Sequence, residues 1–127
     1  MKSISDIMQH HPIVIRPSET LRRALELLIE NNISGLPVVD DAGELIGVLS
    51  EKDLLKIFSA PDPQSIDSVM TPDPVSIAVE APLIDVVDCL MANDFRRVFI
   101  HDHKRLVGLI SRADLMPAIL EALLERC

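Results

Sequence analysis

Two copies of the pattern Ser-x-x-Asp are the residues of this sequence best suited to chemistry. They are Ser50 with Asp53 and Ser111 with Asp114. A serine at a helix N-cap, followed three residues later by an aspartate, places a hydroxyl and a carboxylate beside unpaired backbone N–H groups, whose partial positive charge suits a phosphate. An ionised carboxylate only accepts hydrogen bonds, so it matches the two vicinal hydroxyl donors of a ribose. The same pattern can simply cap its own helix, and for one isolated copy that explanation is favoured.

No pattern in the sequence predicts an enzyme. Ser50 and Ser111 have no histidine near them in a repeated arrangement, and neither Gly-x-Ser-x-Gly nor P-loop spacing occurs. His101 and His103 flank Asp102 at an expected turn, where exposed histidines are a better explanation than a metal site because no third ligand is in view. We therefore expect no catalytic residue, no metal ligand and no obligatory cofactor.

The composition suits a soluble, compact protein that avoids nucleic acid and membranes. The chain has 127 residues, of which 48% are hydrophobic and 25% charged. Aromatic residues make up only 2%, a poor platform for stacking bases, and the net charge of −8 repels polyphosphate chains and anionic lipid. Without a signal-like or membrane-spanning apolar stretch, the expected location is cytoplasmic. Cys89 and Cys127 predict neither a disulfide framework nor a metal site.

An internal repeat emerges when the sequence is shifted along itself by about 62 residues. The aligned pairs include Ile4 with Ile66, Met8 with Met70, Pro12 with Pro74 and, after one residue is dropped in a turn, Gly47 with Gly108 and the two Ser-x-x-Asp pairs. Because the identities fall on polar, glycine and proline positions as well as apolar ones, coincidence is a poor explanation. We expect residues 1–60 and 61–127 to form two copies of one unit.

The first copy predicts the element order βαββα. A short apolar run at 13–15 predicts a buried strand, and Ser18 is a plausible N-cap for a helix with an apolar stripe from Leu21 to Ile29. Segments 36–39 and 45–49 predict a hairpin with Gly43 in its turn. A second helix over about 51–58 precedes a linker containing Pro61 and Pro63.

The second copy repeats this order. It predicts a strand at 75–78, a helix with Pro82 in its first turn, hairpin strands at 98–101 and 106–110, and a longer helix over about 112–125. The apolar stripe of that last helix is wide for one small domain: Leu115, Met116, Ile119, Leu120, Leu123 and Leu124. Contact with another subunit and packing within the chain explain this stripe equally well.

Four motifs together resemble a tandem pair of cystathionine β-synthase (CBS) domains, a Bateman module. They are MTPDPV at 70–75, ISGLPVVD at 33–40, GVLSEKDL at 47–54 and GLISRADL at 108–115. The resemblance covers nearly the whole chain. It implies an α+β fold in which two βαββα repeats are related by a pseudo-twofold axis, with sheets packed face to face and flanking helices. It also implies two clefts for adenosine-containing ligands and frequent dimerisation.

The resemblance further implies two composite nucleotide sites. The first would join Ile13, Ser34, Gly35, Leu36 and Pro37 with Ser111, Arg112 and Asp114; the second would join Thr71, Val75, Arg96, Arg97 and Val98 with Ser50, Lys52 and Asp53. At the first site, Gly35 would let a purine approach the backbone, with Ile13 and Leu36 packing on its faces. At the second, Arg97 matches a phosphate-binding arginine of related modules. Solvated charge at a strand edge is the alternative for Arg96 and Arg97.

Three residues depart from the repeated pattern and leave either site open to degeneration. Gln9 stands opposite Thr71, Phe99 stands opposite Pro37, and Glu51 adds a negative charge near the second site. The expected function is a sensor that binds AMP, ADP, ATP or S-adenosylmethionine and acts, as a homodimer, on an unidentified regulated protein. The alternative is a ligand-free dimerisation or scaffold module.

Overall fold

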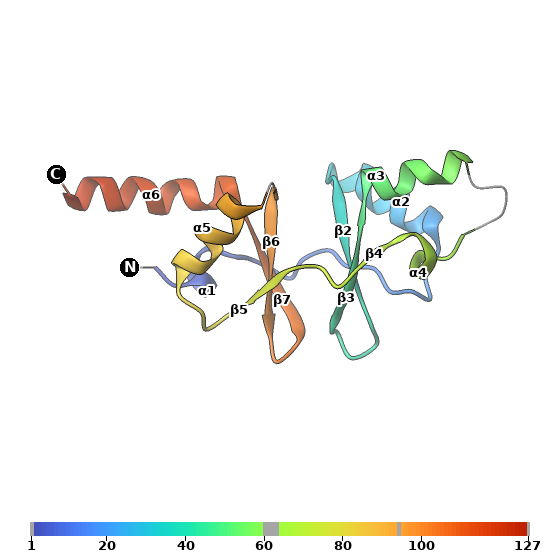
Figure 1. Cartoon of the computed structure of the whole chain (residues 1–127), viewed down its shortest axis with the longest axis horizontal. Coiled ribbons are helices and arrows are strands. Elements are labelled where there is room, and N and C mark those ends of the chain that lie inside the picture. Colours follow the sequence, from blue (N-terminus) through green and yellow to red (C-terminus); the bar gives the residue numbers. More distant parts are fainter. Residues whose placement is uncertain (1, 60–63, 94, 127) are drawn as a thin grey trace. The chain divides into compact units, whose positions relative to one another are not determined.

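The computed structural model describes residues 2–59, 64–93 and 95–126. Its elements, labelled in Figure 1, are α1 (Ile4–Ile7), β1 (Gln9–His10), α2 (Leu21–Asn31), β2 (Gly35–Val39), β3 (Leu45–Ser50), α3 (Glu51–Leu55), the 3₁₀ helix η1 (Lys56–Ser59), α4 (Ile66–Val69), β4 (Thr71–Pro72), β5 (Ser76–Ala78), α5 (Leu83–Ala92), β6 (Arg97–Asp102), β7 (Arg105–Ser111) and α6 (Arg112–Arg126). The expected α+β class with two repeats is confirmed. Pro61, Pro63 and Cys127 lie outside the described residues. Within the described ranges, no helix has both the length and the apolar character needed to cross a membrane.

The chain folds into two compact units whose boundaries differ from those of the sequence repeats. Unit 1 contains Met1–Pro12 and Val75–Cys127, and unit 2 contains Ile13–Pro74. Unit 1 has a sheet in the order β1-β7-β6-β5, and unit 2 has a sheet in the order β2-β3-β4. The short strands β1 and β4 pair antiparallel with β7 and β3, respectively. The first helix and short strand of each repeat therefore belong to the unit that contains the rest of the other repeat. We call these two segments, residues 4–10 and 66–72, the lent segments, and their helices and strands the lent helices and strands.

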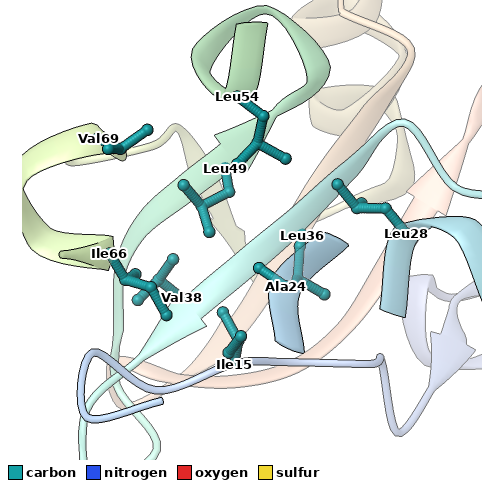
Figure 2. Packing of buried hydrophobic residues seen from close by; sticks show 9 residues of the cluster. All are labelled: Ile15, Ala24, Leu28, Leu36, Val38, Leu49, Leu54, Ile66 and Val69. Carbon is teal, nitrogen blue, oxygen red and sulfur yellow. The ribbon is translucent and has the colours of Figure 1, made fainter. Parts of the chain in front are cut away.

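Buried aliphatic side chains hold these lent segments in place. Figure 2 shows the core of unit 2, which consists of Ile15, Ala24, Leu28, Leu36, Val38, Leu49, Leu54, Ile66 and Val69. The core of unit 1 consists of Ile4, Met8, Val86, Leu90, Val98, Ile100, Ile110 and Leu115. Ile4 and Ile66, from the lent helices α1 and α4, are both 0% exposed. Burying a side chain of this size contributes about 1.5–3 kcal/mol, so each lent helix is anchored by its first residue.

Helix α2 begins later than the sequence predicted. The N-cap is Thr20, whose side chain accepts a hydrogen bond from the Arg23 N–H at 3.0 Å, and the expectation for Ser18 is wrong. A turn delays the helix, because the Glu19 carboxylate accepts from the Arg16 N–H at 2.8 Å. The helix ends as expected at its two asparagines, with Asn32 in the left-handed region at φ 51°.

The predicted strand at 13–15 is reduced to a single bridge. Ile15 pairs with Val38 in parallel, whereas Ile13 is 38% exposed. Ile15 donates to the Pro37 carbonyl and accepts from the Val39 N–H, and the next residue that would face β2 is Pro17, which has no N–H to donate. The matching strand of the second repeat, β5, starts at Ser76 and leaves Val75 outside it and exposed.

Two further helix boundaries differ in detail. The second helix of the first repeat stops being α-helical at Leu55 and continues as η1 to Ser59, rather than running as one α-helix to Phe58. Pro82 is the N-cap of α5 rather than a residue of its first turn. Both hairpins form as expected, and Gly43 adopts φ 83° in the turn between β2 and β3.

Glycines at matching positions of the two hairpins make room for the lent strands. A Cβ added at Gly108 would lie 2.5 Å from Met8 Sδ and 2.9 Å from the carbonyl oxygen of Gln9. A Cβ at Gly47 would likewise meet the Met70 sulfur and would lie 3.1 Å from the carbonyl oxygen of Thr71. Only glycine lets the methionine and the strand that follows it approach this closely.

Replacing Gly108 by alanine should destabilise the protein by about 1–3 kcal/mol, since the new methyl group overpacks against Met8 and Gln9. Gly47→Ala should cost less, because the carbonyl oxygen it meets is 3.1 Å away rather than 2.9 Å. Urea unfolding followed by circular dichroism measures both. In the background of Met8→Ala, Gly108→Ala should remain costly, because the backbone carbonyl cannot withdraw. Unfolding midpoints of Gly108→Ala equal to those of the unmodified chain would refute this packing.

Candidate functional site

In unit 2, Ser50 and Asp53 form a reciprocal hydrogen-bonded pair at the start of α3. The Asp53 N–H donates to Ser50 Oγ at 3.1 Å, while Asp53 Oδ2 accepts from the Ser50 N–H at 3.0 Å and from the Ser50 hydroxyl at 2.9 Å. This is a capping box, so the helix-capping explanation of the motif holds for this copy. Capping does not use up the carboxylate, since its two oxygens together offer about four acceptor sites.

Two further side chains reach the same carboxylate. The hydroxyl of Thr71, on the lent strand β4, lies 3.2 Å from both Oδ1 and Oδ2 of Asp53. Lys56 Nζ lies 3.5 Å from Oδ1. Burial by itself would raise the pKa of Asp53, but hydrogen bonds from Ser50 and Thr71 and the charge of Lys56 outweigh it and hold the pKa below the usual 3.8. Asp53 is therefore an ionised, 5% exposed carboxylate at neutral pH.

Unit 1 repeats this arrangement with a different donor. Asp114 Oδ2 accepts from the Ser111 N–H at 2.8 Å and from the Ser111 hydroxyl at 2.9 Å, and the Asp114 N–H donates to Ser111 Oγ at 3.3 Å. The third donor is Gln9 Nε2, at 2.9 Å from Oδ2. Gln9 lies on the lent strand β1, opposite Leu109 of β7. Gln9 thus takes the structural place of Thr71 despite its different chemistry.

Sequence reasoning identified part of these two clusters. It grouped Thr71 with Ser50 and Asp53, and the structure brings these three side chains together. It treated Gln9 only as a departure from the pattern, although the alignment of Gln9 with Thr71 already indicated a shared position. It missed Lys56, whose i,i+3 spacing from Asp53 in a predicted helix was the available signal.

The expected first-site residues of unit 2 are mostly buried. Gly35, Leu36 and Pro37 lie on β2, where Gly35 pairs with Ser50 of β3, and the Ser34 carbonyl accepts from the Glu51 N–H at 3.0 Å. The expectation that the Leu36 side chain covers a purine is wrong, because it is 0% exposed in the core of unit 2. Of the expected first-site residues in unit 2, Ile13 is exposed and Ser34 is half-buried.

The expected phosphate ligands of unit 1 surround the start of α6. Arg97 pairs with Ser111 across β6 and β7, and the Arg96 carbonyl accepts from the Arg112 N–H at 3.3 Å. Burial lowers the pKa of the Arg97 guanidinium below its usual value, and the charge of Arg96 lowers it further. Arg97 is half-buried, so full solvation does not describe it, whereas Arg96 and Arg112 are exposed. Val98, an expected second-site residue, has its side chain in the core at 1% exposure.

Each expected composite site draws residues from both units. Ile13 and residues 34–37 belong to unit 2, whereas Ser111, Arg112 and Asp114 belong to unit 1. Likewise Ser50, Lys52, Asp53 and Thr71 belong to unit 2, and Val75, Arg96, Arg97 and Val98 to unit 1. The structure describes each unit by itself, so the two combinations stay predictions.

The histidines near the β6–β7 turn have separate partners. His101 Nδ1 lies 2.8 Å from Ser76 Oγ, and His103 Nδ1 lies 2.8 Å from Asp102 Oδ1. His101 is half-buried on β6, so the expectation of an exposed turn histidine is wrong for it. Among the described residues, no group of three or more His, Cys, Asp or Glu side chains is placed to hold a metal ion.

Two α+β units, each with a serine–aspartate pair at a helix start and a donor from a lent strand, define a tandem-repeat module. The chain belongs to the CBS domain family, whose sequence profile matches residues 4–60 and 66–121. The expected family resemblance is therefore confirmed.

Solved relatives share this fold over almost the whole chain. The crystal structure of CBSX2 in complex with AMP is 32% identical, with a TM-score of 0.83, over 96% of this chain and 98% of that chain. That of the CBS-pair protein CBSX2 from Arabidopsis thaliana is 30% identical, with a TM-score of 0.81, over 94% of this chain and 95% of that chain.

A curated relative is longer than this chain. The chloroplastic CBS domain-containing protein CBSX1 of Arabidopsis thaliana is 29% identical over 85% of this chain, and the match spans 59% of the length of CBSX1. The name of CBSX1 assigns that protein to the chloroplast, and the cytoplasmic location expected for this chain stays a prediction.

Because the folded-state pKa of Asp53 is lowered, its ionised form should stabilise the native state above the unfolded value of 3.8 and lose that contribution as the pH falls through the folded value. Removing the charge with Asp53→Asn should cost about 1 kcal/mol near neutrality, as expected for a damaged helix cap. The difference from the unmodified chain should shrink below about pH 4. Urea unfolding at several pH values measures it, with exposed Asp41→Asn as the control. A difference that stays constant down to about pH 2 would contradict the assignment.

Proposed function

We propose that this chain is a regulatory module that binds an adenine nucleotide beside its two Ser-x-x-Asp pairs. The observation that carries the proposal is the 32% identity to CBSX2, which was crystallised with AMP, over 96% of this chain. The pairs supply what AMP requires: N–H groups at a helix start suit the phosphate, and an ionised carboxylate suits the ribose hydroxyls. The capping role and the binding role are compatible, because the carboxylates keep acceptor capacity.

The proposed contacts include more basic than acidic side chains, whereas the rest of the chain has a net negative charge. In unit 2 they are Ile13, Ser34, Gly35, Leu36, Pro37, Ser50, Lys52, Asp53 and Thr71, and in unit 1 they are Val75, Arg96, Arg97, Val98, Ser111, Arg112 and Asp114. Leu36 and Val98 contribute backbone only, since their side chains are buried in the cores. Local arginines and Lys52 offset the net charge of −8, which would otherwise repel a phosphate.

The function we propose involves no catalytic step. The matched CBSX2 chain is covered over 98% of its length, so it contains little besides the domain pair. AMP, ADP, ATP and S-adenosylmethionine all contain adenosine and are the candidate ligands. A bound ligand regulates by binding one conformation more tightly than another, and an unidentified partner protein would respond to that shift.

AMP should raise the melting temperature of the purified protein. At a free AMP concentration about 100 times the Kd, binding to the native state adds about 2.7 kcal/mol, which corresponds to a shift on the order of 5–10 °C for a domain of this size. Differential scanning fluorimetry with AMP, ADP, ATP and S-adenosylmethionine measures it, with GMP as the base control. The double variant Asp53→Ala/Asp114→Ala should lose the shift relative to its own baseline. No shift with any of the four ligands at millimolar concentration would refute nucleotide binding and leave the scaffold alternative.

We also propose that a second copy of the chain covers part of α6. Its outer face carries Met116 at 53%, Leu120 at 58% and Leu124 at 66% exposure, and Leu115 is the one residue of this helix in the core of unit 1. A stripe of large apolar side chains on a 15-residue helix is typical of a surface that another subunit buries. This observation also favours the alternative of a ligand-free dimerisation module.

Replacing Leu120 and Leu124 by glutamate should convert a homodimer into monomers, because two charges would be buried at the interface. Light scattering coupled to size-exclusion chromatography measures the mass. Glu125→Gln, on the same helix, is the control and should leave the mass unchanged. A monomeric mass for the unmodified chain at about 100 μM would contradict the dimer, since stable interfaces hold together well below that concentration.

A further inference from the structure

The turns of the two hairpins differ in charge although they occupy matching positions in the repeats. Residues 40–44, between β2 and β3, include three acidic side chains and no basic one. At the β6–β7 turn, Lys104 and Arg105 are both exposed, and the Asp102 carboxylate already lies 2.8 Å from His103 Nδ1. Within the described part of the chain, neither Lys104 nor Arg105 makes an ion pair. The β6–β7 turn is therefore a small basic surface on a chain whose net charge is −8.

The β6–β7 turn holds its residues in a conformation that their types disfavour. Asp102 pairs with Arg105, so His103 and Lys104 form a two-residue loop. Both have left-handed φ angles, 50° for His103 and 71° for Lys104. Such loops favour Asn-Gly or Asp-Gly, because a Cβ crowds the backbone at positive φ. The turn of unit 2 meets this requirement with Gly43 at φ 83°, whereas the turn of unit 1 contains no glycine and is strained.

The packing of unit 1 does not account for the side chains that bear this strain. His103 is 95% exposed, Lys104 is also exposed, and neither belongs to the core of unit 1. Backbone strain persists in proteins mainly where the strained residues serve a function, and a broken local rule without a packing gain points the same way. A use outside the chain, in contact with another molecule, accounts for a lysine where glycine would fit better.

We propose that the β6–β7 turn is a docking site for a short acidic segment of a partner protein, whose carboxylates pair with Lys104 and Arg105. The planar guanidinium of Arg105 can hold a carboxylate through two parallel hydrogen bonds, which gives the contact a direction. Residues 103–105 span at most about 10 Å, so the tip matches two or three carboxylates of an extended segment. Nucleic acid and anionic membranes are larger polyanions, which the net charge of −8 repels.

The test titrates a fluorescently labelled polyglutamate peptide with the full chain and follows fluorescence anisotropy. We expect saturable binding at about 20 mM salt that weakens severalfold at about 150 mM, because exposed ion pairs are screened. Lys104→Gln and Arg105→Gln should each raise the Kd about three- to fivefold, the effect of losing one exposed ion pair. The matched control is Arg22→Gln, which removes one charge at an 89% exposed position of α2 and should leave the Kd within about twofold.

A second variant tests whether the strained lysine is kept for binding. Replacing His103 and Lys104 by Asn-Gly should raise the melting temperature by about 2–5 °C, because both residues then favour the left-handed turn. The same variant should bind the peptide at least about threefold more weakly, because Lys104 is lost. A more stable protein with weaker peptide binding is the combination that the proposal predicts.

Several results overturn the proposal. They are absence of peptide binding to the unmodified protein, unchanged binding in the Asn-Gly variant, and a loss in Arg22→Gln as large as that in Lys104→Gln. Tighter binding of an oligodeoxythymidylate of equal charge than of the peptide would assign the turn to nucleic acid instead. Self-association of the chain that Asp41→Asn and Lys104→Gln weaken equally would assign it to the acidic turn of a second copy. None of these results bears on AMP binding, because the turn contains none of the proposed nucleotide contacts.

Discussion

Each unit depends on one polar contact, in which a carboxylate at a helix start receives a donor from a strand lent by the other repeat. In unit 2 Thr71 reaches Asp53, and in unit 1 Gln9 reaches Asp114. The carboxylate holds the first turn of its helix and at the same time fixes the position of the lent strand. Asp53 is buried, and leaving its carboxylate unpaired would cost about 1–3 kcal/mol, so in unit 2 the lent strand and the helix start are expected to form together.

The lent strand can approach only because the hairpin beneath it contains glycine. Gly47 and Gly108 accept the side chains of Met70 and Met8, which directly precede the residues that reach the carboxylates. Packing of the preceding helix supplies the energy, through residues such as Ile66 that are fully buried. The buried helix residue, the glycine contact and the polar contact thus lie within a few residues of one another. A substitution that disturbs one of these contacts should therefore weaken the other two.

The sequence predicts most of the fold because both repeats carry the same periodic signals. Hairpins, helices and capping pairs follow from patterns that act over a few residues, and they were placed to within a few positions. The lending of residues 4–10 and 66–72 was not predicted, since it is decided by which core buries Ile4 and Ile66 rather than by local propensity. For the same reason Leu36 was assigned to a ligand surface although the helix α2 and strand β3 bury it. The N-cap of α2 is Thr20 rather than Ser18 because Glu19 forms a turn with Arg16, and this turn leaves no periodic signal in the sequence.

Duplication followed by small substitutions gives this chain two similar but unequal carboxylates, one paired with a lysine and the other beside a proline. The most direct measurement is a crystal structure of the protein grown with AMP. Ribose hydroxyls within hydrogen-bonding distance of a capping carboxylate would agree with the account. AMP bound away from both capping carboxylates would contradict it.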